Sequence, residues 1–113
     1  MYGKQVGPWQ VGFLDEETKA ALDAFPPDIR ARFQRIVELI HAFGLERVRE
    51  PYLKHLEGPL WEMRLRGKSG IARAIYVTAT GMRIVVVHVF AKKTQKTPRK
   101  EIVQALKKAK EVQ

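Results

Sequence analysis

Three arginines in the sequence have the spacing to form a phosphate site. Arg64 and Arg66 are two residues apart in "LWEMRLR", so in a β-strand both side chains point to one face. Arg73 follows the short "GKSG" turn, and antiparallel pairing would bring it close to them. Neighbouring guanidinium groups suit a phosphate, and at a scissile phosphate they would also stabilise the charge of the transition state. The alternative is a solvated sheet face on which Glu62 makes a cross-strand pair.

Further positive charge lies in "FAKKTQKTPRKEI", residues 90–102. Lys92 and Lys93 directly follow an apolar run, so a strand would hold them on a rigid support. The whole chain has 21 Lys and Arg against 12 Asp and Glu, a formal net charge of +9. Such a charge favours a polyanion such as nucleic acid, or an acidic protein, as the partner. Charge that serves only solubility is the other interpretation.

The remaining reactive side chains give weaker indications. His88 in "VVVHVF" can act as a general base near neutral pH, although a histidine inside an apolar strand is more often a packing residue. Tyr76 can stack on a base or donate a proton, and core packing is again the alternative. The three histidines are scattered and cysteine is absent, so we expect no metal site and no disulfide. "GKSG" lacks the context of a phosphate loop, and no cofactor motif is found.

The N-terminal half predicts one strand and two helices. Imperfect alternation indicates a strand at residues 9–14, and Asp15 can cap a short helix that ends before Pro26. A second helix begins at Asp28 and is closed by Gly44. Its buried stripe comprises Ile29, Phe33, Ile36, Val37, Ile40 and Phe43. Residues 45–59 have no clean period and are predicted to form a loop.

The C-terminal half predicts a three-stranded meander and a helix. Alternation indicates strands at residues 60–66, 71–79 and 82–90, the last two joined as a hairpin at Gly81. Thr97 and Pro98 fit the N-cap and first position of a final helix. The apolar stripe of that helix comprises Ile102, Leu106 and Ala109.

This order of elements predicts a single α+β domain over residues 1–113, with a mostly antiparallel sheet, two N-terminal helices packed on one face and a C-terminal helix. We expect the helices to cover one face of the sheet and to leave the arginines on an open, concave face. The longest apolar run is far too short to cross a bilayer. A soluble, cytoplasmic protein is therefore expected.

Several of these stretches together resemble the RelE/ParE superfamily of bacterial toxins, and more narrowly its HigB-like, phage-derived branch. The similarity rests on "GPLWEMRLRGKSGIARAIYV" and "GMRIVVVHVFAKKTQKTP", and "FPPDIRARFQRIVELIHAFG" and "VREPYLKHLEG" also suit that branch. It extends over about residues 9–112. The resemblance implies a RelE-like fold and the toxin of a type II toxin–antitoxin system. Such a toxin is a ribosome-dependent mRNA endonuclease that inhibits translation and growth until a cognate antitoxin binds it.

The resemblance also implies roles for individual residues. In that family the 2′-hydroxyl of the RNA attacks the adjacent phosphate without a metal. By position, Arg64 and Arg73 are predicted to bind that phosphate and stabilise the transition state. Lys92 and Lys93 match a recurrent "KK", with Lys93 favoured on the leaving-group side. The secondary RNA contacts predicted are Arg66, Lys54, Lys96 and Tyr76.

Two features leave alternatives open. The general base is Lys93, His88 or no residue at all. Ala72 stands where relatives often have an aromatic residue before the hairpin arginine, so base stacking is not expected there.

Two other functions fit a basic domain of this kind: a ParE-like, non-enzymatic inhibitor of DNA gyrase, and a plain nucleic-acid-binding module. The expected partners are the ribosome with its mRNA and an acidic antitoxin.

Overall fold

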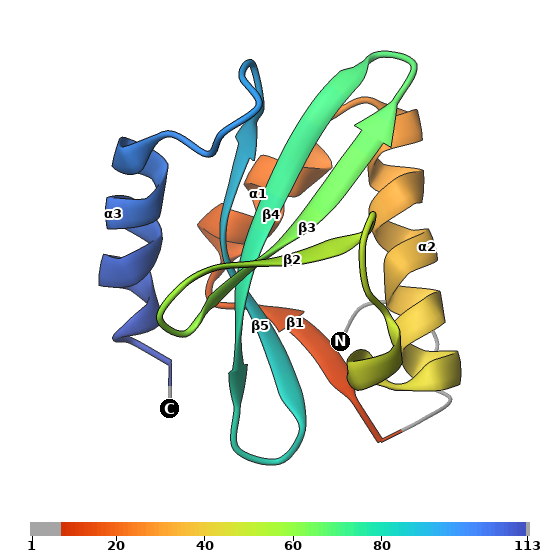
Figure 1. Ribbon diagram of the computed structural model, residues 1–113, viewed down its shortest axis with the longest axis vertical. Helices are drawn as coiled ribbons and strands as arrows, with labels where there is room; N and C mark the ends of the chain where they lie inside the picture. The colour runs from red at the N-terminus through yellow and green to blue at the C-terminus, as the bar shows by residue number, and fades with distance from the viewer. Residues whose placement is uncertain (1–7, 113) are drawn as a thin grey trace.

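A computed structural model describes residues 8–112, which form one five-stranded sheet with helices on both of its faces (Figure 1). The strand order is β1-β5-β4-β3-β2. β1 (Gln10–Phe13) runs parallel to β5 (Arg83–Ala91). β5 pairs antiparallel with β4 (Gly70–Ala79), β4 with β3 (Leu60–Gly67), and β3 with β2 (Leu53–Glu57). The predicted α+β class and mostly antiparallel sheet are confirmed.

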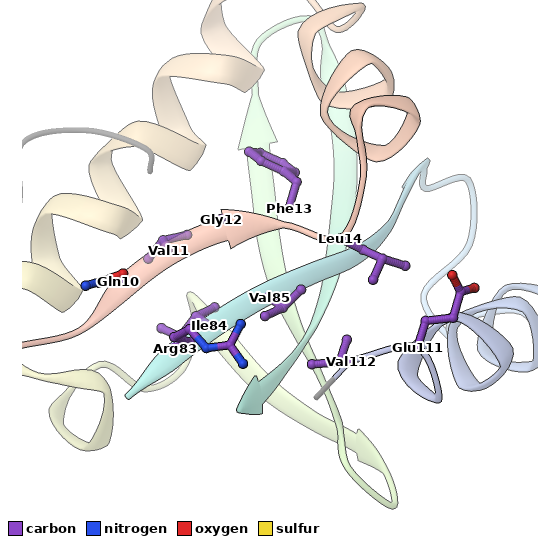
Figure 2. Close-up of a pocket in the computed structure, with 10 residues that line it drawn as sticks. All are labelled: Gln10, Val11, Gly12, Phe13, Leu14, Arg83, Ile84, Val85, Glu111 and Val112. Atoms are coloured by element: carbon purple, nitrogen blue, oxygen red, sulfur yellow. The ribbon is translucent and has the colours of Figure 1, made fainter. Parts of the chain in front are cut away.

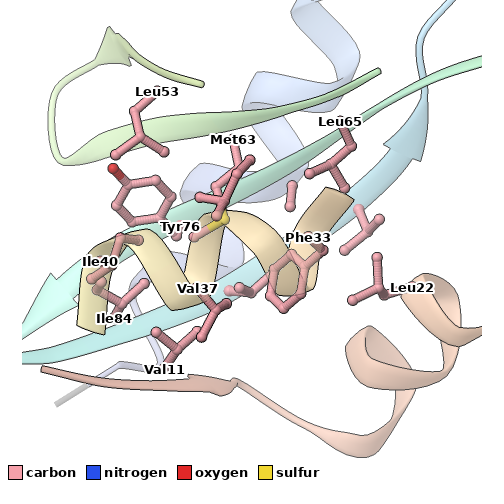
Figure 3. Packing of buried hydrophobic residues seen from close by; sticks show 14 of the residues in the cluster. Val11, Leu22, Phe33, Val37, Ile40, Leu53, Met63, Leu65, Tyr76 and Ile84 are labelled. Atoms are coloured by element: carbon pink, nitrogen blue, oxygen red, sulfur yellow. The ribbon is translucent and has the colours of Figure 1, made fainter. Parts of the chain in front are cut away.

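The two N-terminal helices pack on one face of the sheet. α1 (Glu16–Asp23) begins as predicted, with the Asp15 carboxylate accepting a hydrogen bond from the Thr18 amide at 2.8 Å. α2 (Pro27–Phe43) ends at Gly44, whose φ of 87° suits a residue without a side chain. The apolar stripe of α2 packs onto Met63, Leu65 and Tyr76 to form the main core (Figure 3). Its members on α2 are Ile29, Phe33, Ile36, Val37 and Ile40.

The predicted stripe is one residue too long. Phe43 is 59% exposed, because it lies in the last turn of α2, past the contacts that bury Ile40.

α3 (Arg99–Ala109) packs on the opposite face of the sheet, which corrects the expectation that all helices share one face (Figure 1). Ala105 is fully buried there, and Ile102 and Leu106 pack against a second apolar cluster on β3, β4 and β5. An amphipathic helix must bury its apolar stripe, and the first face is already occupied by α1 and α2. The second face is therefore partly covered.

The segment before β3 is more regular than the sequence suggests, so the predicted loop at residues 45–59 is wrong in part. It contains a short 3₁₀ helix, η1 (Leu45–Arg47), and the edge strand β2. β2 has no clean alternation because only Leu53 is fully buried and the pairing register shifts between His55 and Glu57. A short edge strand of this kind leaves little hydrophobic periodicity in the sequence.

The start of α3 also differs from the prediction. Pro98 occupies the N-cap position and no side chain caps the helix. Thr97, the predicted cap, is 8% exposed and donates its hydroxyl to Glu62 instead. Thr97 lies one residue before the N-cap position, so its oxygen accepts no bond from the first turn of α3 and its hydroxyl instead donates to the buried carboxylate.

A cleft of about 420 Å³ lies between β1, β5 and the residues that follow α3 (Figure 2). Arg83 and Glu111 are its charged lining residues, and none of the predicted site residues lines it. Among residues 8–112, no helix is both long and apolar enough to span a membrane.

The tip of the β3–β4 hairpin is fixed to the start of α2, which generates a prediction. The Asp28 carboxylate accepts a hydrogen bond from the Ser69 amide at 2.8 Å and another from the Ser69 hydroxyl. These bonds hold the pKa of Asp28 below its ordinary value of 3.8. The ionised form therefore stabilises the fold above that pH, and the contribution is lost as the pH falls below it.

We expect Asp28→Ala to lower the urea midpoint at pH 7, and the difference from the wild type to shrink below about pH 4. Asp23→Ala, which removes an exposed carboxylate paired with Lys19 on α1, is the matched control. An equal effect of the two substitutions at pH 7 would contradict the role assigned to Asp28.

Candidate functional site

The pairing of β3 with β4 brings the predicted arginines together. Arg64 and Arg73 are direct cross-strand partners, so both side chains lie on the face that α3 partly covers. Arg66 lies two residues further along β3 on the same face. Lys92 follows β5, and its amide donates to the carbonyl of Ile71, the cross-strand partner of Arg66, at 2.8 Å. Three strands thus place four cations at one end of the sheet.

A buried carboxylate, that of Glu62, lies within this group. Glu62 is 1% exposed, and its Oε1 forms an ion pair with Nη1 of Arg73. The same oxygen is 3.6 Å from Nε of Arg64. Its Oε2 accepts a hydrogen bond from the Thr97 hydroxyl at 2.8 Å. Glu62 therefore joins two strands to the segment that precedes α3.

The electrostatics of the group differ between its members. Burial lowers the pKa of Arg73, the charge of Glu62 opposes this, and the charge of Arg64 adds to it. A guanidinium nonetheless stays protonated at any pH at which proteins are normally studied. Burial likewise lowers the pKa of Lys92, and the charge of Arg73 lowers it further. Lys92 is thus a stronger acid than an ordinary lysine.

The arginines retain hydrogen-bond donors that the described residues do not satisfy. Nε of Arg64 and Nε of Arg73 are both buried and have no hydrogen-bond partner within residues 8–112. At 3.6 Å, the Arg64 Nε to Glu62 Oε1 contact is too long for a hydrogen bond. Both atoms are shielded from solvent, so a ligand can reach this pair only through the exposed part of Arg64.

Arg64 and Arg73 are not equally accessible. Arg73 is 4% exposed, so it acts on a ligand mainly through its charge and its hold on Glu62. The Arg64 side chain is 27% exposed and lies 3.9 Å from the exposed carboxylate of Glu50. Arg64 is therefore the guanidinium that a large anion can reach.

The other predicted RNA contacts lie at the rim of the group. Lys93 is exposed directly after Lys92, and Lys96 is exposed in the turn that Thr94 closes with a 2.7 Å hydrogen bond to the Lys96 carbonyl. Lys54 is exposed on β2 and is the cross-strand partner of Glu62. These three lysines extend the positive surface around the group.

Two predicted residues have other contacts. Nε2 of His88 lies 2.7 Å from Oε1 of Glu101, so the imidazole links β5 to α3 and stacks on Phe90. Tyr76 is 1% exposed and belongs to the core on the α2 face, where burial raises its pKa. The ring packs on the face of the sheet opposite the arginines, so Tyr76 does not belong to the cationic group.

The sequence-based prediction missed the contact of Thr97 with Glu62, and it underestimated the part that Glu62 plays in holding the arginines. Alternation along β3 places Glu62 on the face of Arg64, and this was the available signal. Thr97 is 35 residues away along the chain, and nothing in its local pattern indicates the contact. Among residues 8–112, no cluster of three His, Cys, Asp or Glu has the geometry of a metal site.

The Glu62–Arg73 pair should be costly to break from one side. We expect Glu62→Gln to lower the free energy of unfolding by about 3–5 kcal/mol, because it leaves a buried guanidinium without its counter-charge. The double variant Glu62→Met, Arg73→Met should recover much of that loss, since it buries no unpaired charge. Urea denaturation of Glu62→Met, Arg73→Met and the double variant completes the cycle, with Glu62→Gln as the variant of unchanged shape. Additive losses would show that the pair is not coupled.

Comparisons with known proteins identify the family and the fold. The family model described as "Phage derived protein Gp49-like (DUF891)" matches residues 20–110, which include Arg64, Arg73 and Lys92. No curated protein matches the chain in sequence. Among solved structures, a chain in the crystal structure of the archaeal RelE–RelB complex from Pyrococcus horikoshii OT3 superposes with a TM-score of 0.57. It is 20% identical, and the match covers 74% of this chain and 94% of that chain. With its RelE-like fold, the protein belongs to the Gp49-like family of phage-derived proteins.

Proposed function

We propose that this protein is the toxin of a type II toxin–antitoxin system and cleaves mRNA on the ribosome. Membership of the Gp49-like family and the RelE-like fold support the general class. The observation that carries the proposal is the group of Arg64, Arg73 and Lys92 at one end of the sheet, in which the Arg64 side chain is partly exposed. Such a group is suited to a phosphate on a long, single-stranded anion.

The chemistry needs a charged pocket more than a nucleophile of the protein. The 2′-oxygen of one ribose forms a bond to the adjacent phosphorus, the bond from phosphorus to the 5′-oxygen breaks, and the products are a 2′,3′-cyclic phosphate and a 5′-hydroxyl. The 2′-hydroxyl proton leaves to water. Arg64 neutralises the non-bridging oxygens, whose charge rises in the transition state.

Lys92 is the residue we assign to the leaving 5′-oxygen. Its lowered pKa makes it a better proton donor than an exposed lysine, and its backbone is fixed to β4. Lys93, Lys96, Lys54 and Arg66 are assigned to the RNA backbone on either side. Arg73 is a positioning residue that holds Glu62. We assign no acid–base role to His88, because Glu101 occupies its Nε2.

The proposal includes an antitoxin partner and a place on the ribosome. In the Pyrococcus horikoshii structure, RelE is in a complex with RelB. An acidic protein that covers Arg64 and Lys92 would neutralise the same charges that hold RNA. The formal charge of +9 supports both partners, since the ribosome and an acidic protein are each anionic.

Removal of Arg64 should abolish cleavage without unfolding the protein, because its side chain is partly exposed and Glu62 keeps its pair with Arg73. We expect Arg64→Ala to lower the cleavage rate by about 100-fold or more, as the loss of one transition-state donor typically does. Arg35→Ala, which removes an exposed arginine of α2, should leave cleavage unchanged. The measurement is a map of new 5′ ends of mRNA after the protein is induced alone in cells.

Each outcome of that experiment is informative. New ends with the wild type and Arg35→Ala, but not with Arg64→Ala, support the proposal. Growth arrest with no new ends would favour a gyrase-directed inhibitor. If the protein causes no growth arrest and produces no new ends, the proposal that it is a toxin is contradicted.

Glu50 should weaken RNA binding, because its carboxylate competes with phosphate for Arg64 at 3.9 Å. We expect Glu50→Gln to tighten binding of a short oligoribonucleotide by about two- to fivefold, in line with the small free energy of an exposed ion pair. The gain should disappear in the Arg64→Ala background, as measured by fluorescence anisotropy at low salt. A gain that persists without Arg64 would show that Glu50 acts by general repulsion.

A further inference from the structure

The segment that joins β5 to α3, residues 92–97, is bonded to the sheet at both of its ends (Figure 1). We call it the cationic loop, because it contains Lys92, Lys93 and Lys96. At its start, the Lys92 amide donates to the Ile71 carbonyl of β4 at 2.8 Å. At its end, the Thr97 hydroxyl donates to Oε2 of Glu62 on β3, also at 2.8 Å. The loop is therefore attached to the same two strands that carry the arginines of the site.

Thr97 is the buried residue of this loop. It is 8% exposed, whereas Lys93 and Lys96 are exposed. Pro98 occupies the N-cap position of α3, and no side chain caps the helix. The Thr97 hydroxyl is therefore not used to begin the helix, and its bond to Glu62 instead connects the loop to β3.

α3 has further attachments to the rest of the fold. Ala105 is fully buried against the sheet. Oε1 of Glu101 lies 2.7 Å from Nε2 of His88 on β5, and Nη1 of Arg99 lies 2.5 Å from Oε1 of Glu57. Loss of the Thr97 hydroxyl should therefore release the end of the loop while the helix stays packed.

The backbone of the cationic loop has little freedom while both ends are bonded. The Thr94 hydroxyl donates to the Lys96 carbonyl at 2.7 Å and closes a turn inside the loop. The start of the loop lies beside Arg66, whose cross-strand partner is Ile71. A short segment with fixed ends and an internal bond populates few conformations, so its lysines start from fixed backbone positions.

We propose that Thr97 is a positioning residue, whose bond to Glu62 holds the cationic loop so that Lys93 and Lys96 can bind the RNA backbone. The inference rests on the proposed function, in which these two lysines contact phosphates that flank the one at Arg64. A loop that is ordered before RNA arrives loses less conformational entropy on binding. Thr97 is buried, so it acts through the loop and not by contact with the RNA.

The test measures how the affinity for RNA changes with salt. Each phosphate that a cation neutralises on a single strand adds about 0.7 to the slope of log K against log salt concentration. We expect Thr97→Val to reduce the magnitude of the slope by about 1.4, because Lys93 and Lys96 lose their fixed positions. The substitution leaves the formal charge unchanged, so a smaller slope reports a change in geometry. Thr97→Ser keeps the hydroxyl and should keep the wild-type slope.

The probe is a fluorescently labelled 2′-O-methyl oligoribonucleotide, which lacks the attacking hydroxyl and is therefore not cleaved. Fluorescence anisotropy at a series of sodium chloride concentrations gives the slope. Circular dichroism checks that each variant is folded at the temperature of the measurement.

A matched control separates positioning from a general loss of stability. Thr18 is 2% exposed, and its hydroxyl donates to the Asp15 carboxylate at 2.6 Å, at the start of α1. Thr18→Val therefore removes another buried bond from a hydroxyl to a carboxylate, and it should leave the slope unchanged.

A double-mutant cycle tests whether Thr97 acts through the lysines. The paired substitution Lys93→Gln, Lys96→Gln should reduce the slope by about 1.4 in the wild type. It should have almost no further effect in the Thr97→Val background, because the same contacts are already lost.

The possible failures are distinct. If Thr97→Val keeps the wild-type slope, or if Thr18→Val lowers the slope equally, the inference is overturned and the proposed function stands. If the paired lysine substitution leaves the wild-type slope unchanged, the loop does not bind phosphates and the inference is also overturned. If the wild type does not bind the probe at low salt, the proposed function is overturned together with the inference.

Discussion

The buried carboxylate of Glu62 bonds at once to a neighbouring strand and to the segment before α3. One of its oxygens pairs with Arg73 and the other accepts the Thr97 hydroxyl. A carboxylate out of water is costly unless its charge and its lone pairs are satisfied, and here both conditions are met. Without it, Arg64 and Arg73 would face each other across the β3–β4 pair as unscreened like charges. The cationic group can exist because one anion is buried inside it.

The same two strands serve the core and the site. Along β3, Met63 and Leu65 point to α2, while Glu62 and Arg64 point to the other face. On β4, Ala74 points to the α2 face and Arg73 to the opposite one. Packing that stabilises the fold therefore also fixes the spacing of the guanidinium groups. α3 leaves this end of the face accessible while it covers Ile75 and Val77. The cationic group remains accessible because α3 covers only part of the second face of the sheet.

Local patterns were sufficient for most of the elements. Strong alternation predicted β3, β4 and β5, and helical periodicity predicted α2, because each of these has one continuous buried side. β2 was missed because an edge strand with a register shift buries too little to leave a pattern. The convergence of Arg64 and Arg73 followed from hairpin geometry, which depends only on nearby residues. The burial of Glu62 depends on Thr97, 35 residues away, and no local rule contains that contact. The side of the sheet that α3 covers was likewise decided by space already taken by α1 and α2.

The hairpin of β3 and β4 is held at both ends. Ser69 at its tip is bonded to Asp28 on α2, and Gly67 lies so close to the Asp28 carboxylate that a Cβ there would collide with it. At the other end, Glu62 is joined to Thr97. Guanidinium groups on such a clamped ribbon have little freedom to adjust to a ligand, so little conformational entropy is lost when one binds. A rigid array of this kind works as a template, and it should discriminate among polyanions by the curvature that their backbones can adopt.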